Sequence, residues 1–183
     1  NLNSNTVAGL TSTATTAGMV AVSNQGAVVN TININNNQVG TVSSNAVIFS
    51  AATSGALTLI FNSAGAATAA LSMSNNSIRG TVHLVSGTGG HTYIANTAAT
   101  LSQNISNNTF NNITANTAGS VTFITNSIQL PANGVQTINN NSIVSAFNKP
   151  VPGGTVFLYS ATTTPSSPST ATHTSNGNNF SNI

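Results

Sequence analysis

The side chains that most often perform acid–base, nucleophilic or metal chemistry are almost absent from this sequence. Its 183 residues include no Asp, no Glu and no Cys, and the only cationic side chains are Arg79 and Lys149. Glycosidic bond hydrolysis ordinarily needs two carboxylates, calcium sites are built largely from carboxylate oxygens, and thiolate metal sites need Cys. We therefore predict that the chain is not an enzyme, has no catalytic residues, and carries no metal or cofactor.

Three histidines remain as candidate metal ligands or bases: His83, His91 and His173. A zinc site takes three or four closely spaced ligands, and these histidines fall at different points of the repeat described below. A serine nucleophile needs a positioned base and usually an acidic partner, which the sequence does not offer. With so few ionisable groups, we expect the free energy of folding to change little between about pH 4 and 9.

The composition also limits the partners. Charged residues make up 1% of the chain, against about 25% in ordinary globular domains. Two cations cannot neutralise a phosphate backbone, so we expect no nucleic-acid partner. No apolar run is long enough to cross a bilayer, so we expect no membrane insertion. A chain this rich in Thr, Ser and Asn favours an extracellular or cell-surface location.

One short phrase, an Asn two residues before a large apolar residue, recurs six times. The apolar residues are 32, 39, 32, 33 and 37 residues apart. Such regular recurrence is typical of a solenoid. The six phrases begin at Asn5, Asn37, Asn76, Asn108, Asn141 and Asn178 and end at Val7, Val39, Ile78, Phe110, Ile143 and Phe180.

A second phrase, a Gly followed by residues of alternating polarity, lies between the copies of the first. Alternation with period two and β-branched residues predict a strand. We expect the second and fourth residues after each Gly to point into the core. At the second position these are Val20, Leu57, Thr92, Val121 and Val156.

Together the two phrases predict an all-β solenoid with three strands per coil and three parallel sheets. About five coils of roughly 32–39 residues would occupy residues 1–183 as a single segment. We expect the varying spacing to be absorbed in turns, most clearly at Thr162–Ser169, which contains two prolines. Because the sequence begins and ends within a repeat, we expect an excerpt of a longer protein, with adjoining coils or subunits at both open ends.

The recurring asparagines have a structural interpretation. Asn tolerates the left-handed backbone that a tight corner needs, and its amide can hydrogen-bond to an Asn in the coils above and below. We predict such a ladder. Asp in its place would align like charges about 4.8 Å apart.

The segments Ile105–Ile113 and Ile138–Ile143 resemble repeats of the right-handed parallel β-helix proteins of the pectin-lyase-like superfamily. That resemblance implies a right-handed coil with an Asn ladder at a short turn. Catalytic members of the superfamily use acidic residues, so no catalytic role carries over to this chain. By composition the chain is similar to the passenger and stalk regions of large bacterial surface adhesins, which implies a secreted or cell-surface protein.

The sheet of Gly-led strands offers a candidate binding face. If the second and fourth residues after each Gly point inward, the third and fifth point outward. This interpretation exposes a stripe of apolar, aromatic and Thr side chains: Thr58, Ile60, Tyr93, Ala95, Thr122, Ile124, Phe157 and Tyr159.

Three functions are compatible with these features. The first is a non-catalytic structural or adhesive segment, acting as a rigid stalk or filament with a display face. The second is a glycan-binding module that uses the aromatic stripe, with a glycan or another cell-surface ligand as its partner. The third is an ice-binding solenoid, although a regular Thr-X-Thr rank is missing.

Overall fold

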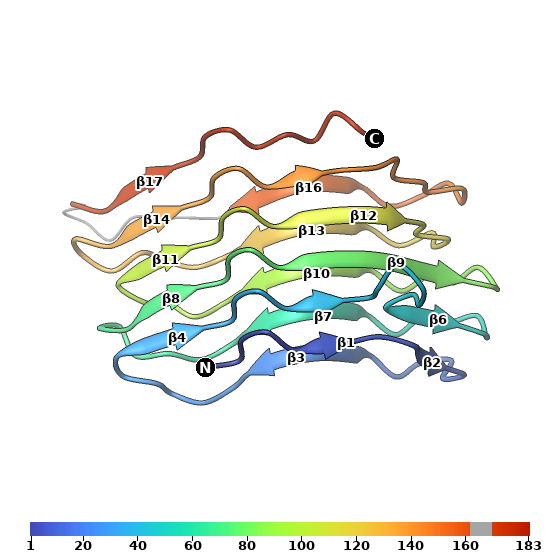
Figure 1. Cartoon of the computed structure of the whole chain (residues 1–183), viewed down its shortest axis with the longest axis horizontal. Helices are drawn as coiled ribbons and strands as arrows, with labels where there is room; N and C mark the ends of the chain where they lie inside the picture. Colours follow the sequence, from blue (N-terminus) through green and yellow to red (C-terminus); the bar gives the residue numbers. More distant parts are fainter. Residues whose placement is uncertain (162–169) are drawn as a thin grey trace.

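The chain folds as a parallel β-solenoid in which successive coils stack along one axis (Figure 1). This computed structural model describes residues 1–161 and 170–183, so the loop predicted at Thr162–Ser169 lies outside the described residues. Every strand pairing is parallel, and the described residues contain no helix. The predicted fold class, with three strands per coil and about five coils, is confirmed.

Sheets B and C contain one equivalent strand from each coil, and sheet A contains two further short strands from the first two coils. Sheet A contains β1 (Thr6–Val7), β5 (Gln38–Val39), β9 (Ser77–His83), β12 (Thr109–Ile113) and β15 (Ser142–Ile143), together with β2 (Leu10–Ser12) and β6 (Val47–Phe49). Sheet B contains β3 (Met19–Asn24), β7 (Leu57–Asn62), β10 (His91–Asn96), β13 (Val121–Asn126) and β16 (Val156–Ala161). Sheet C contains β4 (Thr31–Asn33), β8 (Ala70–Ser72), β11 (Ser102–Asn104), β14 (Val135–Thr137) and β17 (Thr172–Thr174).

The unequal repeat lengths are absorbed outside the paired strands. In sheet A, Val7 pairs with Val39, and Leu10 pairs with Val47. The two paired positions are therefore offset by three residues in the sequence of the first coil and by eight in that of the second. The surplus forms a turn after β5 in which the Thr41 amide donates to the Ser44 carbonyl at 2.6 Å. Coils of different length thus keep their strands in register.

The register of sheet B corrects part of the prediction. Leu57 pairs with Met19 on one side and with His91 on the other, so Val20 and Thr92 are not the inward residues of their strands. Val20 is 47% exposed. In these two strands the Gly directly precedes the first inward residue, whereas one extra residue intervenes in the other three. The predicted inward positions, which are counted from the Gly, are therefore wrong by one residue in two of the five strands.

A second departure occurs in the middle of the sheet B strands. In β7 and β13 two consecutive residues, and in β10 four, are buried where simple alternation would expose every second one. Tyr93 and Phe123 have no partner in the β10–β13 pairing register, which marks the interruption of the regular ladder. In β7 and β13 the side chains that follow are reversed relative to the prediction, so Ile60 and Ile124 point inward rather than outward.

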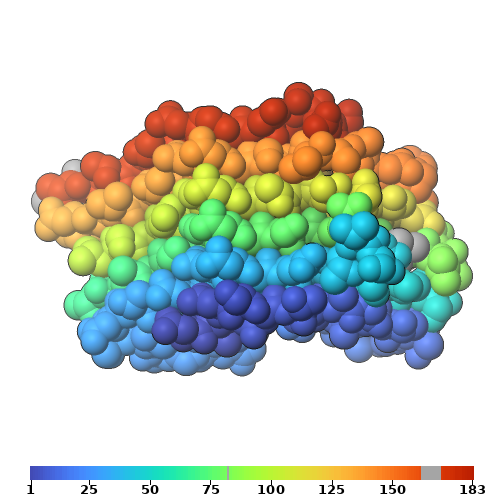
Figure 2. Space-filling model, viewed as in Figure 1, coloured from blue at the N-terminus to red at the C-terminus, as the bar shows by residue number. Residues whose placement is uncertain are grey.

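The core is narrow and becomes partly aromatic in the middle coils. The anchor residues Val39, Ile78, Phe110 and Ile143 are at most 1% exposed and follow one another from coil to coil. A run of ring contacts crosses the core through Phe49, His83, His91, Tyr93, Phe110, Phe123 and Phe147. On the face shown in Figure 2, the coils follow one another as layered bands from the N-terminus to the C-terminus.

Candidate functional site

The predicted asparagine ladder is present at the corner between sheets C and A. From Asn37 onward, each ladder Oδ1 accepts two hydrogen bonds from the Asn one coil earlier, one from its main-chain N–H and one from its Nδ2. All ten of these N···O distances lie between 2.9 and 3.0 Å. The rungs are Asn5, Asn37, Asn76, Asn108, Asn141 and Asn178, so the structural assignment of all six is confirmed.

The second proton of each ladder amide points back into the preceding coil. For example, Asn108 Nδ2 donates to the Met73 carbonyl at 2.9 Å. Both amide protons and the oxygen of Asn108 are therefore occupied, as a fully buried amide requires. An amide suits this position because it donates and accepts at once, whereas a carboxylate could only accept.

The left-handed corner residue is not the ladder Asn, contrary to the prediction, but the residue directly before it. This residue has a φ between 56° and 64° in every copy. A positive φ at the preceding residue turns the chain, and the ladder Asn can then direct its side chain inward. The six corner residues are Ser4, Asn36, Asn75, Asn107, Asn140 and Gly177.

A further ladder of opposite direction lies one residue before the corner. Here a main-chain N–H of the later coil donates to the side-chain oxygen of the earlier coil, over 2.7–3.4 Å. At this corner, each pair of neighbouring coils is therefore connected by hydrogen bonds donated from the earlier coil and by hydrogen bonds donated from the later coil. The residues are Asn3, Asn35, Ser74, Ser106, Asn139 and Asn176.

The core contains a third amide column that the sequence interpretation missed. Asn24, Asn62, Asn96 and Asn126 end four sheet B strands, and their side chains join at 2.7 Å per step. The column continues from Asn126 Nδ2 to the Gln103 side chain in sheet C at 2.9 Å. A signal was available, because four of the five Gly-led strands end in Asn.

The structure brings together two of the three histidines. His83 Nε2 and His91 Nε2 are 2.8 Å apart, and the side chains are 5% and 2% exposed. The ring centroids are 4.8 Å apart with an interplanar angle of 23°, so the rings are nearly coplanar and meet edge to edge. The prediction that these histidines fall at separate points of the coil is wrong for this pair. His173 lies apart from it, exposed in β17 beside Gln136.

Burial determines the electrostatics of the pair. It lowers the pKa of His91 to about 3, with further lowering by the nearby positive charges of His83 and Lys149. Burial also lowers the pKa of His83, against a smaller raising effect from the main chain of Val85. Neither Nδ1 has a hydrogen-bond partner among the described residues. Both rings are therefore neutral at pH 7, and one Nε2–H donates to the other Nε2.

Two other titratable side chains lie in the core and at its rim, Tyr93 and Lys149. Burial raises the pKa of Tyr93, whose hydroxyl has no hydrogen-bond partner among the described residues. Lys149 Nζ donates to the carbonyls of Thr117, Val151 and Gly153 at 2.7, 2.8 and 2.6 Å, which fastens the turn after β15. In the described part of the chain, no group of three or more His, Cys, Asp or Glu side chains could hold a metal ion.

The proposed binding face is largely buried. Ile60 and Ile124 are 0% exposed, because the interrupted alternation turns them into the core. Tyr93 is 0% exposed because its strand starts one position earlier relative to its Gly, and Ala95 is 6% exposed. Tyr159 is half-buried and stacks on His173 with the ring planes 8° apart. Thr58, Thr122 and Phe157 do reach the surface. The prediction of an exposed aromatic stripe on this sheet is therefore wrong.

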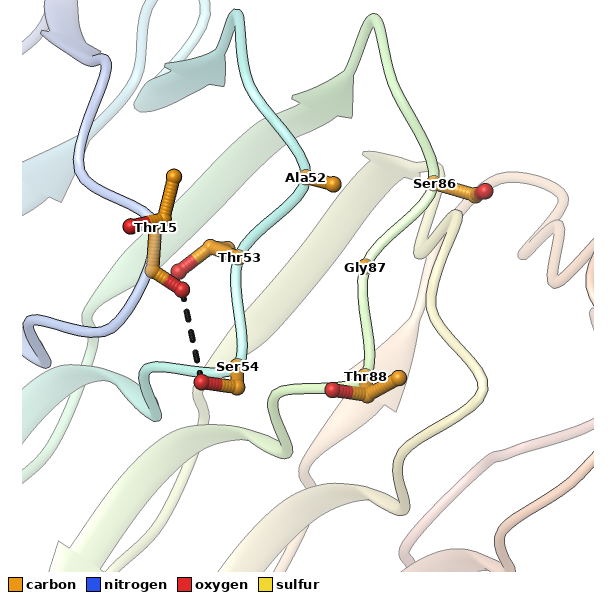
Figure 3. Close-up of a pocket in the computed structure, with 7 residues that line it drawn as sticks. All are labelled: Thr15, Ala52, Thr53, Ser54, Ser86, Gly87 and Thr88. Carbon is orange, nitrogen blue, oxygen red and sulfur yellow. Dashed lines mark hydrogen bonds between the residues drawn. The ribbon is translucent and has the colours of Figure 1, made fainter.

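A groove of about 240 Å³ lies instead over the turns that lead into sheet B. It crosses three neighbouring coils (Figure 3). Its lining is neutral and dominated by small hydroxyl side chains, and Ser54 Oγ donates to the Thr15 carbonyl at 3.3 Å. None of the lining side chains titrates near neutral pH, so the groove has no proton-transfer group. The lining residues are Thr15, Ala52, Thr53, Ser54, Ser86, Gly87 and Thr88.

Comparisons with protein-family models, with curated proteins and with solved structures find no match to this chain. Within the described residues, no helix has the length and apolar character needed to span a membrane.

Proposed function

We propose that this chain is a non-catalytic structural segment of a secreted or cell-surface repeat protein, serving as a rigid stalk or filament with a display face. The observation that carries the proposal is the six-rung asparagine ladder, in which every internal rung is tied to both neighbouring coils. Because each coil contacts only its neighbours, such ties resist bending and stretching along the whole stack.

The chemistry of the chain supports a passive role. The 183 residues include no carboxylate and no thiol side chain. The closest pair of titratable side chains, His83 and His91, is enclosed in the core rather than directed at solvent. General acid–base catalysis needs such groups within reach of a substrate.

The repeat-level resemblance to pectin-lyase-like β-helix proteins, and the compositional likeness to adhesin stalks, support the same proposal as an analogy. A protein exposed outside the cell gains from a surface with almost no charge, because salt and pH changes then alter few of its interactions.

A test of rigidity uses the natural absence of Cys for site-specific spin labelling. Thr6 and Ser142 occupy the same outward column of sheet A, joined through Gln38, Ser77 and Thr109 by parallel pairing. Four coil steps of about 4.8 Å place their Cα atoms roughly 19 Å apart. For the Thr6→Cys/Ser142→Cys variant, we expect a single narrow distance distribution that does not change between low salt and 1 M NaCl. A broad or salt-dependent distribution would contradict the stalk.

A test of location uses antibodies raised against the folded chain. We expect them to label intact, unpermeabilised cells that produce the protein. Labelling that appears only after permeabilisation would contradict the cell-surface assignment.

The glycan-binding alternative has lost its main support, since Tyr93 is buried and only Phe157 and Tyr159 of the aromatic stripe retain surface. The structure adds little support for the ice-binding alternative. Thr58, Thr92 and Thr122 do form one column on sheet B, but Val20 and Phe157 stand at its two ends.

A further inference from the structure

The buried histidine pair joins two sheets within one coil. His83 ends β9 in sheet A, His91 begins β10 in sheet B, and the seven residues 84–90 connect them. Their Nε2 atoms meet at 2.8 Å beneath the ring of Phe49, whose centroid is 4.3 Å from that of His83. This contact therefore stabilises the turn of residues 84–90, which connects the two sheets in the middle of the stack.

The contact can hold only a limited number of protons. In the neutral pair one Nε2 carries a proton and donates it to the bare Nε2 of the other ring. One added proton still leaves an acceptor for this hydrogen bond. A second added proton places two N–H groups against each other at the same 2.8 Å, so the closed contact cannot contain two imidazolium ions.

Little around the pair offsets added positive charge: only the main chain of Val85 favours the charged form of His83, and its effect is smaller than that of burial. From β6 the pair faces Phe49, from β10 it faces Tyr93, and from the turn after β15 it experiences the cationic Lys149. The Tyr93 hydroxyl is buried and stays neutral in acid. The sequence contains no Asp or Glu that could serve as a counter-ion. A proton that the pair takes up in acid therefore adds a positive charge, and water can solvate this charge only if the pair opens to solvent.

We propose that the His83–His91 pair is an acid-labile joint: its protonation opens the coil segment formed by β6, β9 and β10, while the coils on the C-terminal side remain closed. Local opening is expected in a solenoid because each coil contacts only its neighbours. The joint does not depend on the proposed stalk function.

Proton linkage sets the size of the effect. A buried histidine binds a proton much more weakly than an opened one, whose pKa is about 6.5. Opening is therefore favoured as the pH falls below 6.5, by up to tenfold per pH unit for each histidine, and the closed state is undisturbed above that pH. With the pKa of His91 at about 3, His91 alone raises the opened fraction roughly hundredfold at pH 4.5.

Native-state hydrogen exchange of the full chain between pH 7.5 and 4.5 tests the joint. After correction for the intrinsic pH dependence of exchange, we expect protection factors in β6, β9 and β10 to fall at least about hundredfold. Protection in β13 should fall much less. A uniform loss across all strands, or no loss in β6, β9 and β10, would overturn the proposal.

Two variants assign the effect to the pair. His91 stands between Leu57 and Val121 in the register of sheet B, so Leu is compatible with this column. In the His83→Leu/His91→Leu variant we expect β9 and β10 protection to become independent of pH. His173→Gln, which replaces the exposed histidine, should retain the wild-type acid response. An acid response that persists in the double variant would overturn the proposal.

The wild-type protein provides a measurement that does not depend on folding of the variants. Imidazole ¹⁵N NMR should show two neutral rings at pH 5.5, one protonated at Nε2 and the other at Nδ1. If either ring titrates near pH 6.5 while β9 and β10 keep their protection, the joint does not exist.

Discussion

Replacing one internal rung of the asparagine ladder isolates the interaction that ties the coils together. Asn108 is 0% exposed, and its side chain takes part in four hydrogen bonds of 2.9–3.0 Å. In Asn108→Ala, the main-chain N–H and one amide proton of Asn76 lose their acceptor. The Met73 carbonyl and Asn141 Oδ1 each lose a donor.

Each buried group left without a partner costs about 1–3 kcal/mol, and two donors are stranded here. The acceptors lose less, because a carbonyl oxygen is more easily left partly satisfied. We therefore expect Asn108→Ala to lower the free energy of unfolding by about 3–5 kcal/mol. Equilibrium urea unfolding followed by circular dichroism measures this change from the shift of the midpoint.

The neighbouring residue supplies the matched control. Asn107 is exposed and has a φ of 59°, and it makes no side-chain hydrogen bond to the described residues. Asn107→Gly retains the left-handed backbone and should change the free energy of unfolding by no more than about 1 kcal/mol. A cost below about 1 kcal/mol for Asn108→Ala, or equal costs for the two variants, would refute the ladder as the source of cohesion.

Three further substitutions, the last with Arg79→Met as its control, test separate parts of the same reasoning. Asn108→Asp should be less stable than Asn108→Ala at pH 7, and the gap should narrow below about pH 4 in urea titrations, because burial raises the pKa of the new carboxyl and protonation removes its charge. Tyr93→Phe should leave the thermal midpoint unchanged or raise it slightly, since it removes a buried hydroxyl without a partner; a loss above about 1 kcal/mol would contradict this. Lys149→Met should cost about 1–3 kcal/mol in urea unfolding by freeing three carbonyls, whereas Arg79→Met, which removes no side-chain hydrogen bond to the described residues, should cost less than about 0.5 kcal/mol.

The fold and the main ladder were predictable because both follow from a repeated local phrase. Each rung is an Asn two residues before an apolar residue, and stacking converts that recurrence directly into contact between coils. The residue with positive φ was misplaced by one position, because both residues at the corner are often Asn. Position within the phrase, not residue type, distinguishes them.

The sheet B surface was not predictable from alternation alone. A strict period of two places Leu59 inward and Ile60 outward, yet both are buried. The interruption that buries both is a property of the complete coil, which must bend to close around a narrow core. No local sequence signal separates Ile60 from an outward residue, since Ile is equally compatible with either face.

The histidine pair was missed because the contact depends on tertiary structure. His83 and His91 are eight residues apart in the sequence, at the end of one strand and the start of the next. Only the path of the intervening turn brings their Nε2 atoms together. The pair also revises the expected insensitivity to pH, because two buried neutral histidines couple folding to protons below pH 6.5 even in a chain without carboxylates.

The ladder and the acid-labile joint have a common origin in the absence of charge. A column of identical side chains brings each group within one strand spacing of its copies, so a carboxylate at any rung would repel the next across about 4.8 Å. Amides avoid this repulsion and satisfy one another, which favours a neutral sequence wherever coils stack in register. The same neutrality leaves no counter-ion for an imidazolium in the core. A solenoid held together by amides should therefore be insensitive to salt throughout, yet sensitive to acid at the coil where histidine replaces an apolar residue.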